Sequence, residues 1–142
     1  MLGRKNYTPE EINSARTAVS AEVAAYQKLA AAVDGAADPA AAGALEAFEP
    51  LFFNNLVIVL DRYFVHRLRT IAGKDGTPVN EVALLSDSLM TNDGVLLGSK
   101  VIRYVPEQSV SKVNVGDRIA LSQEQFERIA AGFLADIESK FL

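Results

Sequence analysis

The chain has 142 residues, of which 49% are hydrophobic and 23% charged, a balance typical of one globular domain covering residues 1–142. Its formal net charge of -4 disfavours nucleic acid as a partner, because proteins that bind nucleic acid usually carry an excess of basic residues. The absence of cysteine excludes disulfides, thiolate metal sites and cysteine nucleophiles.

Neither a secretory signal nor a membrane-spanning segment is predicted. No apolar stretch follows the basic pair Arg4-Lys5, so the sequence indicates a cytoplasmic protein. The most apolar run, from Leu51 to Leu60, is shorter than the ~20 residues that a helix needs to cross a bilayer. We therefore expect no association with a membrane.

The first predicted helix begins at Pro9 and ends at about Val33. Thr8-Pro9-Glu10-Glu11 matches a capping box, in which the threonine accepts a backbone hydrogen bond and the second glutamate reaches back to the cap. The apolar residues that follow at steps of three or four are Ile12, Ala15, Val19, Val23, Tyr26, Leu29 and Val33. The next segment, from Asp34 to Gly43, contains small residues with glycine and proline, which predicts a loop.

The second predicted helix begins at about Ala44 or Pro50 and ends at Ala72. Its broad apolar face contains Phe53, Leu56, Val57, Leu60, Tyr63, Phe64, Leu68 and Ile71. Ile58, Val59 and Val65 lie on or beside the opposite, polar face. A helix that is apolar on several sides is normally buried on several sides. This helix is therefore either central in the fold or meets a second subunit through Ile58, Val59 and Val65, and the second alternative predicts a homodimer.

The remaining chain is predicted to contain two more helices separated by an extended arm. Thr77-Pro78 can cap and begin a helix that ends near Met90 to Asp93. Residues 95–121 are rich in β-branched side chains but are interrupted by Pro106, which favours an extended arm over a regular sheet. A second capping box at Ser122 begins an amphipathic helix that reaches the C-terminus. The predicted fold class is all-α or mostly α, a compact bundle of four to five helices with a central apolar helix.

The common signatures of metal and nucleotide sites do not occur in the sequence. The one histidine, His66, cannot form the paired-histidine motifs of zinc or di-iron helical sites. Neither a glycine-rich phosphate loop nor a G-x-S-x-G turn occurs. The sequence therefore predicts no metal, no cofactor and no catalytic residue, and it favours a protein that is not an enzyme.

One group of basic residues remains as a candidate ligand site, which we call the cationic stripe. Arg62, His66 and Arg69 have the spacing i, i+4 and i+7, so they share one face of the predicted second helix, and Lys74 follows in the adjoining turn. Two arginines on one face can bind a phosphate or carboxylate with bidentate hydrogen bonds. The alternative is structural, because cations near the end of a helix interact favourably with its dipole. The same cations can also pair with nearby acidic residues, namely Asp61, Asp75 and Glu81.

Three segments resemble sequences found in a group of small bacterial proteins of unknown function. They are HRLRTIAGKDGTPVNEV (66–82), VGDRIALS (115–122) and FLADIESKF (133–141). The resemblance covers roughly the last 80 residues of the chain. It implies a compact bacterial cytoplasmic domain and brings no catalytic residues with it.

Two functions follow as expectations. The first is a helical interaction or structural module that forms a homo-oligomer through the second helix. The second is a protein or enzyme that binds a small anionic ligand through Arg62, His66, Arg69 and Lys74.

Overall fold

The computed structural model describes residues 3–142, and over that range it contains helices and loops but no β-strand. The helices are α1 (Pro9–Ala36), α2 (Pro39–Tyr63), α3 (Arg69–Ala72), α4 (Pro78–Thr91) and α5 (Gln123–Phe141), with a short 3-10 turn η1 (Pro106–Gln108). The predicted all-α class is confirmed. Both predicted capping boxes are also present, at Thr8 and at Ser122.

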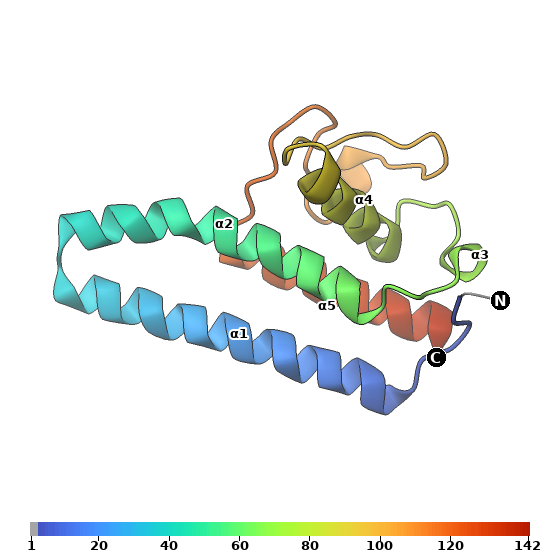
Figure 1. Ribbon diagram of the computed structural model, residues 1–142, viewed down its shortest axis with the longest axis horizontal. Coiled ribbons are helices and arrows are strands. Elements are labelled where there is room, and N and C mark those ends of the chain that lie inside the picture. Colours follow the sequence, from blue (N-terminus) through green and yellow to red (C-terminus); the bar gives the residue numbers. More distant parts are fainter. Residues whose placement is uncertain (1–2) are drawn as a thin grey trace.

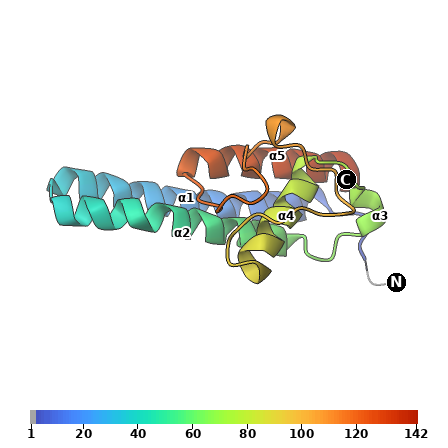
Figure 2. The same cartoon turned by 90° about the horizontal axis from the view of Figure 1, so that it is seen from above.

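Helices α1 and α2 form a long antiparallel hairpin on which the rest of the chain is assembled (Figure 1). α5 and α4 lie against the half of the hairpin nearer the chain termini, so the outer half projects beyond both in the two views (Figures 1 and 2). α2 packs against α1, α4 and α5, and it is therefore the central helix that the sequence predicts.

The core lies where α2 meets α5 and is rich in aromatic rings. Phe53 on α2 packs against Phe126 on α5, with the ring centroids 5.6 Å apart. The largest side chains that are fully buried are Phe53, Phe64, Phe126, Phe133, Phe141, Ile12, Leu56, Leu60, Leu85, Leu96, Leu121 and Ile129. Burial of apolar area at ~25 cal/mol per Å² is the main force that holds these helices together.

The predicted loop from Asp34 to Gly43 is wrong, because the helices continue through most of it. α1 extends to Ala36, and Ala37 makes the turn in a left-handed conformation with φ of 51°. Asp38 then caps α2 by accepting a hydrogen bond of 3.0 Å from the amide of Ala40. Alanine has the highest helix propensity, which outweighs the glycines in this segment.

The predicted continuous helix from Pro50 to Ala72 is also wrong, because α2 ends at Tyr63 and Pro50 lies inside it. Phe64 leaves the helical path and packs in the core, with its ring centroid 4.9 Å from that of Tyr7 and 5.7 Å from that of Phe133. Residues 69–72 form the separate helix α3.

Residues 95–121 form the predicted extended arm, which runs past α4 to the start of α5 and contains no β-strand (Figure 1). An isolated bridge joins Val95 to Arg118 in antiparallel fashion. The amide of Leu96 donates to the carbonyl of Asp117 at 2.9 Å, and the amide of Gly116 donates to the carbonyl of Leu96 at 2.9 Å. Backbone contacts of this kind close the arm into a loop whose two ends lie together.

Within residues 3–142, α2 is the one helix that is long and apolar enough to cross a membrane by length and composition. In its most apolar window, 22% of the residues are buried inside the fold. The apolar helix is therefore longer than the run from Leu51 to Leu60 that the sequence analysis considered. Much of the surface of α2 is not covered by the rest of the fold.

Candidate functional site

The four residues of the cationic stripe do not share a helical face. Arg62 lies in α2, His66 in the link that follows, Arg69 at the start of α3 and Lys74 in the next turn. All four are exposed, and their side chains make no hydrogen bond or ion pair within the described residues 3–142. The prediction of one face was wrong because α2 ends before His66.

Arg67, which the sequence analysis did not single out, is the arginine that organises this link. Its guanidinium donates to the carboxylate of Asp61 at 2.7 Å and to the carbonyl of Phe64 at 3.0 Å, and 10% of its side chain is exposed. It also lies over the ring of Phe133, 5.6 Å from the centroid. Arg67 therefore supplies donors to the C-terminal end of α2, where backbone carbonyls lack helical partners.

The N-terminal segment fixes the same link from the other side. The amide of Arg4 donates to the carbonyl of His66 at 2.7 Å, and the amide of Leu68 donates to the carbonyl of Arg4 at 2.9 Å. His66 is thus held through its backbone while its side chain stays exposed.

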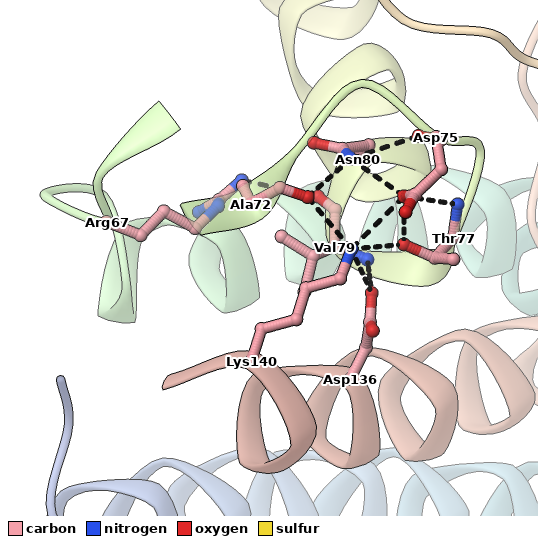
Figure 3. A network of polar contacts seen from close by, with 8 residues as sticks. All are labelled: Arg67, Ala72, Asp75, Thr77, Val79, Asn80, Asp136 and Lys140. Carbon is pink, nitrogen blue, oxygen red and sulfur yellow. Dashed lines mark hydrogen bonds and ion pairs between the residues drawn. The ribbon is translucent and has the colours of Figure 1, made fainter. Parts of the chain in front are cut away.

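A polar network joins α5 to the turn between α3 and α4 (Figure 3). The ammonium of Lys140 donates to the carbonyl of Ala72 at 2.8 Å, to the hydroxyl of Thr77 at 2.6 Å and to the carboxylate of Asp75 at 3.1 Å. Asp136, one turn earlier on α5, accepts from the amide of Val79 at 2.9 Å. The network pins the start of α4 onto α5.

The charged groups of this network are engaged with one another, which indicates a structural role. The hydroxyl of Thr77 and the ammonium of Lys140 hold the pKa of Asp75 at about 2, below its usual value of 3.8. Asn80 donates from its amide nitrogen to the carbonyl of Ala72 and to Asp75. The ammonium of Lys140 is held by its hydrogen bonds to Ala72, Asp75 and Thr77, so it is not positioned to act as a nucleophile or base.

Glu81 on α4 is the most buried carboxylate of the described residues, with 1% of the residue exposed. Its two oxygens accept from the amides of Val110 at 3.0 Å and Ser111 at 2.8 Å. These bonds tie the middle of the extended arm to α4. Glu81 was named in the sequence analysis as a partner for an arginine, and it binds backbone amides instead.

Two hollows lie side by side along α4, and we call them together the α4 cleft. The first, of about 210 Å³, is lined by Asp61, Val65, Arg67, Arg69, Ala72, Asn80, Ala83 and Asp87. The second, of about 470 Å³, is lined by Arg69, Leu84, Asp87, Ser88, Thr91, Leu97, Gly98, Ser99 and Ile102. Arg69 and Asp87 belong to both hollows. Of the cationic stripe, Arg69 is the member that borders this cleft.

The three predicted interface residues lie in two different environments. Ile58 and Val59 on α2 are half-buried and line a small apolar hollow of about 230 Å³ together with Arg62 and Tyr63. Val59 also packs against the core. Val65 is 41% exposed, but it lies beyond the end of α2 and lines the α4 cleft.

The sequence matches no protein-family model, and neither the curated proteins nor the solved structures give a match. Residues 3–142 also hold no group of three or more histidine, aspartate or glutamate side chains placed to bind a metal ion. Function must therefore be argued from the surfaces and hollows described above.

Proposed function

We propose that the protein acts as a homodimeric interaction module whose subunits meet through the outer face of α2. We call this face the α2 stripe, and it consists of Phe48, Leu51, Asn55, Ile58 and Arg62. Steps of three and four residues separate its members, which is the spacing of a coiled-coil seam.

The observation that carries the proposal is the exposure of this seam. The buried residues of α2 are Phe53, Leu56, Val57 and Leu60, which face the core, whereas the stripe lies on the other side of the helix. Leu51 is 67% exposed and Phe48 is 42% exposed. A contiguous exposed apolar surface on a globular protein marks an interaction site more often than isolated apolar residues do.

The order of residues along the stripe fits a second copy of the same chain in antiparallel orientation. A two-fold axis at Asn55 places its amide opposite the same amide of the partner, and an amide can both donate and accept. Leu51 then lies near the partner's Ile58, and Phe48 near the partner's Arg62, where the guanidinium can lie over the ring. A parallel pairing would instead bring the two Arg62 side chains together, which like charges disfavour.

A polar residue at one position of such a seam sets register at a cost in stability. Asn55 has this position between Leu51 and Ile58. The stripe from Phe48 to Arg62 is about 21 Å long at 1.5 Å per residue, enough for two turns of seam on each side of the axis.

Polar attachments of α2 favour this partner over a lipid bilayer. Asn54 donates to the carbonyl of Ile119 at 2.9 Å and accepts from the amide of Leu121 at 3.0 Å. Glu49 accepts from the amide of Gln123 at 2.9 Å. Insertion of α2 into a bilayer would break these bonds and place unpaired polar groups in hydrocarbon, at several kcal/mol each.

The test is the molar mass of the protein in solution, measured by light scattering at micromolar concentration. We expect the wild type to have twice the 15.3 kDa mass of the chain. Leu51→Glu should raise the dimer dissociation constant at least tenfold, because it places a charge against the apolar side chain of the partner's Ile58 on each side of the two-fold axis. Met90→Glu is the matched control, since Met90 is 66% exposed on α4 and should leave the dimer intact.

A monomeric wild type would refute the proposal, as would a dimer that Leu51→Glu does not weaken. Binding of the wild-type monomer to phosphatidylcholine vesicles, lost in Leu51→Glu, would assign the α2 stripe to a membrane surface instead.

A further inference from the structure

We propose that the α4 cleft binds a small zwitterion, namely a free α-amino acid with an apolar side chain. The proposal concerns a different surface from the α2 stripe and does not depend on dimer formation. The cleft is built from the link after α2, the helix α3, the outer face of α4 and the start of the extended arm.

The charges of the cleft are balanced, which fits a zwitterion better than an anion. Its charged lining residues are Asp61, Arg67, Arg69 and Asp87, two of each sign. Arg67 and Asp61 already form an ion pair of 2.7 Å. Arg69 and Asp87 form no ion pair with each other or with another side chain of residues 3–142, although both line the same two hollows.

Arg69 and Asp87 can therefore take the two charged groups of an amino acid. The guanidinium of Arg69 presents a planar fork that matches a carboxylate, and the carboxylate of Asp87 can accept from an ammonium. Arg62, His66 and Lys74 lie outside the linings of the two hollows. A purely anionic ligand would leave the free carboxylate of Asp87 without a partner.

The side-chain oxygen of Asn80 in the first hollow supports the same assignment. Asn80 is 2% exposed, and its amide nitrogen is turned toward Asp75 and Ala72, to which it donates (Figure 3). Because those partners are all acceptors, the orientation of the amide is fixed. Its oxygen accepts no hydrogen bond within residues 3–142 and belongs to a residue that lines the hollow. This oxygen is open to the hollow, and as an acceptor it is available to a ligand ammonium.

The second hollow provides space for the side chain of the ligand. Leu84, Leu97 and Ile102 supply apolar surface there. The hydroxyl oxygens of Ser88 and Ser99 accept from backbone amides at the wall, so they are already partly engaged. At about 470 Å³ the hollow is many times the ~30 Å³ that one water occupies. Its size lies within the range of small-molecule sites, and its lining combines polar and apolar side chains.

The test is isothermal titration with L-leucine and three analogues that each lack one part of it. N-acetyl-L-leucine lacks the ammonium, L-leucinamide lacks the carboxylate, and glycine lacks the apolar side chain. We expect saturable one-to-one binding of L-leucine, with each analogue at least tenfold weaker. The loss of either charged group leaves Arg69 or Asp87 unpaired in the complex.

Two variants locate the site without disturbing the fold. Arg69→Gln and Asp87→Asn remove exposed charges that hold no other residue, so both should fold as the wild type and bind L-leucine at least tenfold more weakly. Lys74→Gln and Glu22→Gln make the same charge changes at exposed positions outside the cleft and should bind normally.

The proposal is overturned if L-leucine, L-methionine and L-phenylalanine all fail to bind at about 10 mM, a ligand concentration that detects even weak affinity. It is equally overturned if N-acetyl-L-leucine binds as well as L-leucine, or if Arg69→Gln and Asp87→Asn leave the affinity unchanged.

Discussion

The α1–α2 hairpin and the segment from residue 64 to residue 121 are ordered by different forces. The hairpin is ordered by apolar residues at helical spacing, with polar groups at its caps. The later segment contains the short helix α3, the helix α4 and a long irregular arm, and polar side chains hold its backbone. Glu81, Asn80 and Lys140 bind backbone amides or carbonyls within it.

This difference in how the two regions are ordered explains why the proposed dimer interface and the proposed ligand site lie in different regions. Helix α2 packs against α1, α4 and α5 but leaves the face opposite its buried residues free, and the α2 stripe is this face. An irregular segment fixed by side chains can enclose polar hollows, because it need not pair its backbone with a neighbouring strand. The α4 cleft lies in that second region.

The largest effect is expected from removal of an aromatic ring in the hairpin core. Phe53→Ala deletes a fully buried ring that packs against Tyr26 and Phe126. We expect the free energy of unfolding to fall by about 4 kcal/mol, as for other buried phenylalanines. Urea denaturation measures this loss, with Met90→Ala as the exposed control. A loss below about 1 kcal/mol would show that apolar packing does not dominate in the hairpin.

Glu81→Ala tests the irregular segment and should cause the next largest loss in the free energy of unfolding. It leaves the amides of Val110 and Ser111 without an acceptor in a buried place. We expect a loss of about 3 kcal/mol in the free energy of unfolding and fast hydrogen exchange at these two amides, with the helical circular-dichroism signal retained. Glu22→Ala on the exposed surface of α1 is the control. Unchanged exchange at Val110 and Ser111 would contradict the account of the arm.

Lys140→Met keeps the length of the side chain and removes its three hydrogen bonds. The side chain is 17% exposed, and the loss of its ammonium removes the hydrogen bonds that hold the turn before α4 against α5. We expect destabilisation by about 1–2 kcal/mol in a urea titration. Lys28→Met, at an exposed position of α1, should change stability by less than about 0.5 kcal/mol. Equal stability changes in the two variants would contradict a structural role for the network.

The smallest effect is the response to acid, which has the same sign in both regions. The hydrogen bond from Arg4 lowers the pKa of Glu11 from 4.5 to about 2, and the hydroxyl of Thr77 lowers that of Asp75 from 3.8 to about 2. Because both folded pKa values are depressed, this stabilisation is complete above about pH 5 and is lost as the pH falls toward 2.

Glu11→Gln and Asp75→Asn should each flatten the loss of stability between pH 5 and pH 2, measured by thermal unfolding. Added salt should weaken the contribution of the exposed Arg4–Glu11 pair more than that of Asp75, whose main partner is a neutral hydroxyl. Identical acid profiles in the wild type and both variants would contradict the assignment.

How much the sequence predicts also differs between the two regions. The first residues of α1 and α5 follow from local capping boxes at their N-termini, so the start of each helix was predicted correctly. The end of α2 depends on Phe64 and Arg67 contacting Tyr7 and Phe133, which lie far away in the sequence. Local periodicity therefore continued the helix too far, and the cationic stripe was placed on a face that does not exist.

The candidate cleft was predicted only through Arg69. Asp87 lies on the outer face of α4, where a carboxylate usually faces solvent, and Asn80 resembles an ordinary residue of a first helical turn. Their proximity to Arg69 depends on the fold of the link and of α3. More of the α2 stripe could be predicted, because the sequence analysis named Ile58 as an interface residue. Leu51 and Phe48 can be assigned to the stripe only once the exposed side of α2 is known.

The most direct test of the central claim uses the absence of native cysteine, since one cysteine introduced on α2 can form a disulfide only between subunits. Asn55→Cys lies on the proposed two-fold axis and should give a covalent dimer under mild oxidation. Leu51→Cys should not, because an antiparallel seam separates the two copies of residue 51 by about 12 Å along the axis, beyond disulfide reach. Rapid cross-linking of Leu51→Cys, or a monomeric Asn55→Cys protein, would contradict the account.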